Sequence, residues 1–296
     1  MIDGGLSNQL ANQGCDLNHF LWTAQLIKSD PEAIIRAHLA YLGAGAQCIT
    51  TSSYQASIPG FVAMGIKEDE AGQLILKSVD LAQIAIERFL ASHPDKKRPL
   101  IAASIGPYGA YLADGSEYRG QYGISDEELI DFHAPRIEIL DSSRADILAF
   151  ETIPGFQETQ VLSKILKKVK KKAWVSFSCR DDHHINDGTP IVKCISLLNS
   201  LSSVFAVGVN CTKPRYITGL IRKIKTTCAD KKIVVYPNSG DVYNPISKSW
   251  IRSSEPETYT KVIEEWIKEG ADIVGGCCQV GPDRIKDAAT VLRKYN

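Results

Sequence analysis

Short apolar, β-branched segments alternate with helical patterns along the whole chain, and this alternation constrains the fold more than any other feature. Most of these segments lack strict polar alternation, as expected for parallel strands covered on both faces. The predicted strands span residues 48–54, 100–106, 147–151, 174–179, 205–211, 233–237 and 273–278, with residues 1–3 as a shortened first strand. The predicted helices span residues 31–42, 68–91, 125–141, 156–170, 190–201, 214–227, 257–269 and 282–294.

Eight strand–helix units in a chain of 296 residues predict an α/β fold, a single (β/α)8 TIM-type barrel over residues 1–296. A doubly wound open sheet is the main alternative. Polar residues at the strand ends favour the barrel, because a barrel gathers all these ends at one rim, where active sites form. The first and last strands are neighbours only in a closed sheet, so the barrel predicts Asp3 beside Cys277 and Cys278.

The charge balance argues for small-molecule partners. The chain has 34 basic and 34 acidic side chains, which gives no electrostatic basis for binding nucleic acid or a membrane surface. No segment approaches the ~20 consecutive apolar residues of a membrane span. The first five residues lack a charged leader and an apolar stretch, so we expect no secretion signal and a cytoplasmic location. The oligomeric state stays open.

Three of the eight cysteines lie at predicted strand ends. Cys211 ends one strand, and Cys277 and Cys278 end the last one. The adjacent pair is poorly placed to form a disulfide with itself, but three thiolates at one rim predict a zinc site with an open fourth position. A vicinal redox pair is the alternative, although it lacks the Cys-x-x-Cys spacing. The remaining cysteines are interpreted as small buried side chains: Cys15, Cys48, Cys179, Cys194 and Cys228.

The composition of this site indicates its chemistry. Three thiolate ligands make zinc a weak Lewis acid for activating water, whereas hydrolytic zinc sites use histidine and carboxylate ligands. Zinc also holds an incoming thiol as the thiolate, which is the nucleophilic form. The site therefore predicts a thiol substrate that becomes alkylated, and it disfavours a zinc hydrolase.

The motifs around the three cysteines resemble those of a known family. Gly208-Val209-Asn210-Cys211 and Gly275-Gly276-Cys277-Cys278 look like the zinc motif of the homocysteine S-methyltransferase family. The resemblance extends over essentially the whole chain, through Asp3-Gly4-Gly5, Phe150-Glu151-Thr152 and residues 236–240. Residues 104–120 resemble the members that use S-methylmethionine as the methyl donor.

The resemblance implies a substrate and its binding residues. Homocysteine sulfur would bind zinc at the open position, and Asp3 and Glu151 would receive its ammonium group. Asn238 matches a position that can ligate zinc when homocysteine is absent. Without the resemblance, Glu151 is interpreted as part of a salt bridge, and Asp3 and Asn238 are interpreted as turn residues. The implied reaction moves a methyl group from S-methylmethionine, or less well from S-adenosylmethionine, to the zinc-bound thiolate of homocysteine, giving methionine.

A sulfonium donor needs a site for a cation rather than an acid. Aromatic faces attract such cations, and Trp22, Tyr54, Tyr108 and Tyr111 are candidates, with ordinary packing as the alternative. The leaving group departs as a neutral thioether, so no catalytic group is expected beyond the zinc centre. Three alternative functions stay open: a betaine-type methyltransferase, a selenocysteine methyltransferase and a non-catalytic zinc or thiol sensor. His183 and His184 are interpreted as residues of a solvated loop.

Overall fold

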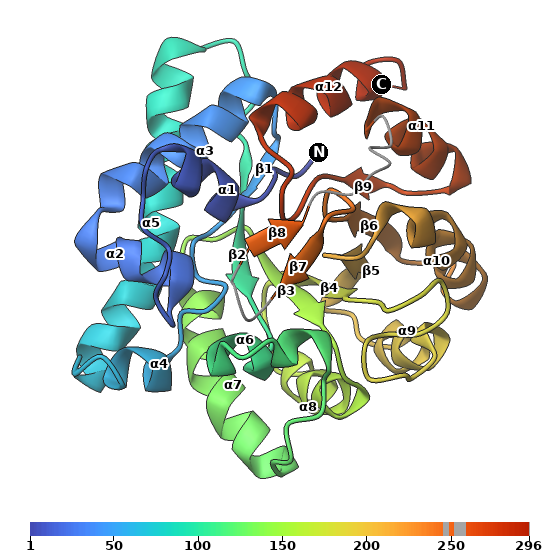
Figure 1. Ribbon diagram of the computed structural model, residues 1–296, viewed down its shortest axis with the longest axis horizontal. Helices are drawn as coiled ribbons and strands as arrows, with labels where there is room; N and C mark the ends of the chain where they lie inside the picture. The colour runs from blue at the N-terminus through green and yellow to red at the C-terminus, as the bar shows by residue number, and fades with distance from the viewer. Residues whose placement is uncertain (245–248, 252–258, 296) are drawn as a thin grey trace.

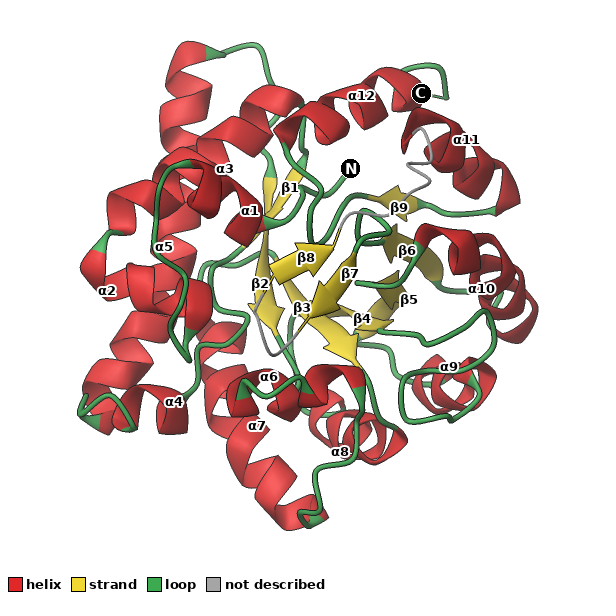
Figure 2. Ribbon diagram, viewed as in Figure 1, coloured by secondary structure: helices red, strands yellow, loops and turns green. Residues whose placement is uncertain are grey.

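Seven parallel strands form a curled sheet with helices around its outside (Figures 1 and 2). The computed structural model describes residues 1–244, 249–251 and 259–295. The strands pair in the order β1-β2-β3-β4-β5-β6-β9. They span Cys48–Thr50 (β1), Leu100–Ile105 (β2), Ile147–Ile153 (β3), Lys172–Phe177 (β4), Val204–Asn210 (β5), Lys232–Tyr236 (β6) and Ile273–Val274 (β9).

The N-terminal residues close the sheet into a barrel. The Ile2 N–H donates to Val274 O at 2.8 Å, and the Asp3 N–H donates to Cys48 O at 3.0 Å. The N-terminal segment therefore lies between β9 and β1 and bonds to both. The predicted (β/α)8 TIM-type barrel is confirmed. The predicted first strand at 1–3 is shorter than a regular strand, because its parallel ladder is a single bridge between Ile2 and Cys48.

The eight predicted helices are present, with the start of the helix predicted at 257–269 lying outside the described residues. They span Pro31–Ala44 (α3), Glu68–Ser92 (α5), Asp126–Ser142 (α7), Phe156–Leu166 (α8), Ile191–Asn199 (α9), Pro214–Thr227 (α10), Tyr259–Glu269 (α11) and Pro282–Leu292 (α12). Short elements that the sequence analysis did not predict are Leu6–Asn12 (α1), Trp22–Gln25 (η1), Leu26–Ser29 (α2), Ile58–Val62 (α4), Tyr108–Leu112 (α6) and Ser116–Tyr118 (η2). An antiparallel hairpin of Val242–Asn244 (β7) and Ser249–Ile251 (β8) follows β6.

Local capping explains where two of the long helices begin. The predicted cap of α3 is confirmed: the Asp30 carboxylate accepts the Ala33 N–H at 3.0 Å, and Pro31 is the first helical residue. Helix α7 begins with a capping box in which Ser125 and Glu128 each accept the other's backbone N–H. These bonds satisfy N–H groups that have no partner inside a helix.

The apolar core has two layers. The larger layer lies between the strands and the helices. The smaller one fills the barrel interior, where Trp174 stands among small side chains such as Ala102, Ala149 and Ala206. The Trp174 indole donates to the Tyr236 hydroxyl at 3.0 Å, so this large side chain is both packed and hydrogen-bonded. The barrel is therefore a filled core, and ligands have to bind at its rim.

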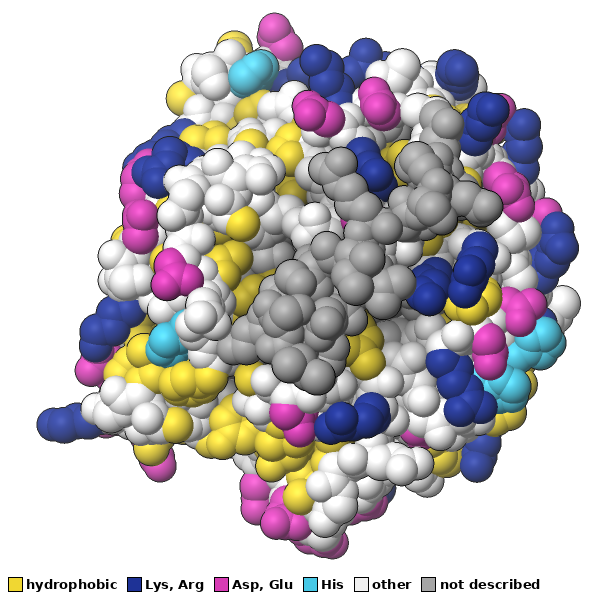
Figure 3. Space-filling view, in the orientation of Figure 1, with side chains coloured by type: hydrophobic (Ala, Val, Ile, Leu, Met, Phe, Trp, Pro, Cys, Tyr) yellow, Lys and Arg dark blue, Asp and Glu magenta, His cyan; other side chains and the backbone are white. Residues whose placement is uncertain are grey.

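The surface shows acidic and basic side chains interspersed around the face drawn in Figure 3. Such mixing agrees with the zero net charge of the sequence. Within the described residues, no helix combines the length and apolar character needed to cross a bilayer.

Candidate metal centre

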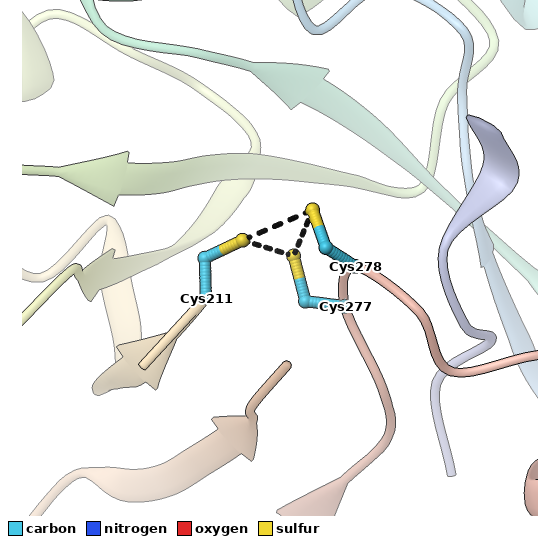
Figure 4. A group of neighbouring side chains, drawn as sticks. All are labelled: Cys211, Cys277 and Cys278. Atoms are coloured by element: carbon cyan, nitrogen blue, oxygen red, sulfur yellow. Dashed lines mark hydrogen bonds between the residues drawn. The ribbon is translucent and has the colours of Figure 1, made fainter. Parts of the chain in front are cut away.

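The three cysteines at the predicted strand ends meet at the rim of the barrel (Figure 4). Cys211 directly follows β5, and Cys277 and Cys278 lie in the turn after β9. The Cys211 sulfur lies 2.8 Å from the Cys277 sulfur and 3.4 Å from the Cys278 sulfur, and the last two are 4.0 Å apart. All three distances exceed the ~2.05 Å of a disulfide bond, so the thiols are free and converge on one point.

Backbone contacts with the loop after β6 hold this arrangement. The Cys277 N–H donates to Pro237 O at 2.8 Å, and the Ser239 N–H donates to Cys278 O at 3.0 Å. Cys211 has a φ of +46°, a left-handed conformation that side chains other than glycine rarely adopt. Such strained residues concentrate at functional sites, because the surrounding structure must enforce them.

The two neighbouring thiols polarise Cys211. Its pKa is lowered because Cys277 and Cys278 donate hydrogen bonds to its sulfur, and the Tyr118 hydroxyl adds a weaker one. The pKa of Cys277 is raised in turn, first because it is the donor in the bond to Cys211. Three soft sulfur donors at these separations could together hold a metal ion.

Asp3 lies beside this cluster, as the closed barrel predicts. Its carbonyl oxygen accepts the Gly276 N–H at 2.9 Å, one residue before Cys277. The residue is 1% exposed, and its carboxylate accepts the Thr50 N–H at 2.9 Å and the Thr50 hydroxyl at 3.0 Å. Burial raises the pKa of Asp3 well above its usual value, and the charge of Glu151 adds to that effect. The two carboxylates therefore repel each other, and a cation placed between them would relieve the repulsion.

Glu151 reaches the rim through an irregularity in its strand. The β3–β4 register shifts between Phe150 and Ile153, and Thr152 has a φ of +62°. The Glu151 carboxylate accepts hydrogen bonds from the hydroxyls of Ser104 and Tyr236. Burial raises its pKa to about 7, against these two hydrogen bonds, which lower it.

Asn238 occupies a turn. Its side-chain oxygen accepts the Gly240 N–H at 3.0 Å, the pattern of an Asx turn, and its backbone N–H donates to Thr212 O at 3.2 Å. The side chain is 7% exposed and lies in the segment that contacts Cys278 through Ser239. This geometry assigns the amide oxygen to the turn, and a role for Asn238 as a zinc ligand stays a prediction.

The aromatic candidates fall into two groups. Trp22 and Tyr54 pack edge to face with ring centroids 6.2 Å apart, and the hydroxyl of Tyr54 interacts electrostatically with Cys211. Tyr108 and Tyr111 instead pack together at 5.5 Å, and both contact Phe132 of α7. Tyr54 is therefore the aromatic candidate that the structure brings to the cysteines, and Tyr108 belongs to a packing cluster beside them.

Three further residues at this site belong to motifs of the sequence analysis that gave them no role of their own. Glu117 and Tyr118 reach Cys211 from η2, more than ten residues beyond the end of β2, where no strand pattern points to the rim. Asn210 is fully buried, and its side chain lies 3.9 Å from the Cys277 sulfur. A fully polar side chain in an otherwise apolar strand was a signal that could have identified Asn210.

A second group of potential ligands lies in the loop after β4. Asp181, Asp182 and His183 come close together on the surface. Their polar atoms already serve the loop: Asp181 accepts the backbone N–H groups of His183 and His184 at 2.7 Å, and His183 bonds to Asp182 at 2.7 Å. The geometry agrees with the interpretation as a solvated loop.

Comparisons with known proteins agree on one family. The family model for homocysteine S-methyltransferase matches residues 1–292. Homocysteine S-methyltransferase YbgG of Bacillus subtilis (strain 168) is 43% identical over 297 residues, covering 99% of this chain and 94% of that protein. Selenocysteine Se-methyltransferase of Brassica oleracea var. italica is 42% identical over 300 residues, covering 97% of this chain and 86% of that protein.

A comparison with solved structures indicates the same family. The crystal structure of the Escherichia coli homocysteine methyltransferase MmuM in its metallated form matches with a TM-score of 0.88 and 39% identity, covering 98% of this chain and 94% of that one. The chain is therefore an enzyme of the homocysteine S-methyltransferase family.

Proposed function

We propose that this enzyme transfers a methyl group from S-methylmethionine to the sulfur of homocysteine, giving two molecules of methionine, and that it depends on zinc held by Cys211, Cys277 and Cys278. The observation that carries the proposal is the convergence of three thiols beside two buried carboxylates at the barrel rim. The similarity to MmuM in a metallated form supports a metal at this site.

The donor set fits zinc. Zn–S bonds of ~2.3 Å in a tetrahedral arrangement place sulfur atoms ~3.8 Å apart. The Cys277–Cys278 separation of 4.0 Å is close to this, whereas Cys211 has to move by roughly an ångström to match it. Within the described residues, no histidine, carboxylate or further cysteine joins the group. Zinc bound there would keep a thiol substrate deprotonated at neutral pH, although a free thiol has a pKa of ~8.5.

The side chains around the cluster supply binding and orientation. Asp3 and Glu151 are buried acceptors beside the thiols, so their two carboxylates suit the ammonium group of an amino-acid thiol. In the transfer, the acceptor sulfur forms a bond to the methyl carbon, and the bond from that carbon to the donor sulfur breaks. The electron pair stays on the donor sulfur, which leaves as a neutral thioether. The reaction needs no general acid, and the residues mainly position the two sulfur atoms in line.

The test is an activity assay with matched donors. The purified enzyme is incubated with homocysteine and either S-methylmethionine, S-adenosylmethionine or betaine, and methionine is measured. We expect S-methylmethionine to give the highest rate and S-adenosylmethionine a lower one. Cys277→Ser is expected to lose both zinc and activity, whereas Cys15→Ser, which changes a cysteine outside the cluster, is expected to retain both. An active Cys277→Ser enzyme without zinc would contradict the proposal.

Selenocysteine is a second candidate acceptor. The observation that favours it is the 42% identity to the Brassica oleracea var. italica selenocysteine Se-methyltransferase. Selenocysteine is shorter than homocysteine by one methylene, a difference that a binding site can discriminate by roughly 10–200-fold. Measuring kcat/KM for both acceptors with the same donor decides which one this site prefers.

A further inference from the structure

We propose that the carboxylate of Glu117 binds the positive charge of the sulfonium donor and holds the donor beside Cys211. The inference rests on the proposed function, because it assigns the donor half of the same site. The predicted donor residues were all aromatic, and Glu117 adds a negative charge to them.

Glu117 lies at the rim with the thiols. It belongs to η2, and the hydroxyl of the next residue, Tyr118, donates a hydrogen bond to Cys211. The carboxyl group of Glu117 interacts electrostatically with Cys211 and with the hydroxyl of Tyr54. Glu117 therefore shares its surroundings with the nucleophile site and with the aromatic candidate nearest to it.

One oxygen of this carboxyl group has no partner in the part of the chain that the structure describes. Glu117 Oε2 is buried and makes no hydrogen bond to any of the described residues. An acceptor buried in this way costs about 1–3 kcal/mol unless something binds to it. Arg119 is a cation that interacts with Glu117, but its guanidinium group is exposed and bonds to Asp114 at 3.2 Å and to the Ser116 hydroxyl at 2.9 Å. Among the described residues, none occupies this oxygen, so it can accept a ligand.

The backbone around Glu117 is fixed by close packing. A Cβ atom added at Gly109 of α6 would lie 2.4 Å from the Glu117 nitrogen, so α6 and η2 touch through a glycine. At Gly120, which has a φ of +74°, an added Cβ would lie 2.6 Å from Pro154 O. The Ser178 hydroxyl donates to the Glu117 carbonyl at 3.4 Å. The carboxylate is therefore presented by a rigid segment, which lowers the entropy cost of binding a ligand.

The count of charges fits two bound substrates. Asp3 and Glu151 are both proposed for the single ammonium group of homocysteine, so the sulfonium centre of S-methylmethionine is a further cation to be matched. A third carboxyl group at the rim, that of the partly exposed Glu117 in the loop after β2, is available for it. Burial raises the pKa of Glu117 to about 7, and a bound cation would favour its ionised form.

The chemistry predicts which kinetic parameter Glu117 controls. During methyl transfer the donor sulfur changes from a sulfonium to a neutral thioether, so its attraction to a carboxylate weakens along the reaction. An interaction that is stronger in the bound substrate than in the transition state lowers KM and also lowers kcat, because it stabilises the bound substrate more than the transition state. Glu117 therefore acts mainly on donor binding, and the product loses this attraction when it forms.

The test compares Glu117→Gln with Glu127→Gln, which changes an exposed glutamate of α7. Calorimetry measures the binding of S-methylmethionine and of methionine, its neutral thioether counterpart, to the zinc-loaded proteins. We expect Glu117→Gln to weaken S-methylmethionine binding about tenfold or more and to leave methionine binding within about twofold. Equal losses for both compounds, or no loss for S-methylmethionine, would overturn the proposal.

Steady-state kinetics separates this inference from the proposed function. Glu117→Gln is expected to raise the donor KM while the homocysteine KM and the zinc content stay within about twofold of the unmodified enzyme. If the unmodified enzyme makes no methionine, the proposed function fails, while the calorimetric comparison still tests Glu117. If Glu117→Gln does not fold, Glu117→Asp replaces it: it keeps the charge on a shorter arm and is expected to raise the donor KM, and an unchanged donor KM would contradict the inference.

Discussion

Thr152 and Asn210 hold each other through two hydrogen bonds. The Thr152 N–H donates to Asn210 Oδ1 at 2.7 Å, and Asn210 Nδ2 donates to the Thr152 hydroxyl at 2.8 Å. The two residues belong to β3 and β5, which are separated by β4. Each lies next to a site residue, Glu151 in one strand and Cys211 after the other. The pair therefore couples the position of the carboxylate to that of the thiol.

Asn210→Ala tests this coupling. The variant leaves the buried Thr152 N–H without its acceptor, and we expect the free energy of unfolding to fall by about 2 kcal/mol. The homocysteine KM should rise, because Glu151 and Cys211 lose their common support. Urea unfolding and steady-state kinetics measure the two effects. Asn199→Ala, at the end of α9, is the control, and a homocysteine KM that is equally unchanged in both variants would contradict the coupling.

Gly275→Ala tests how the barrel closes. An added Cβ would lie 2.8 Å from Ile2 Cβ and 2.9 Å from Asp3 O, so the N-terminal segment would have to move. We expect a loss of about 1–3 kcal/mol in stability and a lower zinc content. Gly43→Ala is the control, because its added Cβ meets open space within α3 and should stabilise the helix by up to ~1 kcal/mol. Thermal unfolding measures the stability of both variants, and metal analysis measures their zinc content. If the two variants have the same stability and zinc content, barrel closure tolerates a side chain at position 275.

Glu158 is the centre of a buried polar network beneath α6. Its carboxylate accepts the Tyr108 N–H at 2.6 Å and the Tyr122 hydroxyl at 2.8 Å, and it bonds to His133 Nε2 at 2.8 Å. His133 in turn bonds to Arg136 at 2.9 Å, and the Arg136 guanidinium donates to Gly106 O. These contacts anchor both ends of the loop that carries Glu117.

Glu158→Ala would leave several of these buried groups without partners. We expect a loss of about 3 kcal/mol or more in the free energy of unfolding, since an uncompensated buried charge on Arg136 is costly. Glu158→Gln keeps an acceptor for the Tyr108 N–H, so we expect a smaller loss in the free energy of unfolding. Glu138→Ala, at an exposed position of the neighbouring α7, should change stability by under ~0.5 kcal/mol. A Glu158→Ala protein as stable as the Glu138→Ala protein would exclude a structural role for the network.

His38 makes stability depend on pH. It is fully buried, its two ring nitrogens lack hydrogen-bond partners among the described residues, and burial lowers its pKa from 6.5 to about 4. Because the folded pKa is depressed, the unfolded chain binds the proton first as the pH falls. The contribution of His38 is therefore complete above pH 6.5 and is lost between pH 6.5 and about 4, by roughly 3 kcal/mol in total.

Denaturant unfolding between pH 4 and 7.5 measures this dependence. His38→Leu, which carries no titrating group, is expected to show a shallower loss of stability on acidification than the unmodified protein. His93→Leu is the control, because it replaces an exposed histidine at the end of α5. Parallel curves for the His38→Leu and unmodified proteins would contradict the account.

The repeated strand–helix pattern predicted the barrel and the shared rim, because both follow from local periodicity and from the polar residues at strand ends. The predictions of where the strands end were less accurate. The prediction for β1 ran to Tyr54, but the strand ends at Thr50, because the hydroxyl groups of Thr51 and Ser53 bond to the backbone of Ser104: Thr51 accepts its N–H at 3.0 Å, and Ser53 donates to its carbonyl oxygen at 2.7 Å. Such side-chain bonds give the backbone an alternative to the ladder.

The site was predictable where its residues follow strands and unpredictable elsewhere. Cys211, Cys277 and Cys278 follow β5 and β9, so the barrel alone brings them together. Glu117 reaches the same place through α6 and η2, and its position depends on the packing of Gly109 against it. Contacts of this kind depend on tertiary packing between a loop and the rim, and local sequence periodicity does not predict them.

The central claim is that the three cysteines hold a zinc ion whose remaining position takes the sulfur of homocysteine. Zinc-edge X-ray absorption on the zinc-loaded enzyme, with and without homocysteine, tests it most directly. The account predicts three sulfur ligands at ~2.3 Å without homocysteine and four with it, while serine, which has no thiol, adds none. A sulfur count that homocysteine leaves at three would contradict the claim.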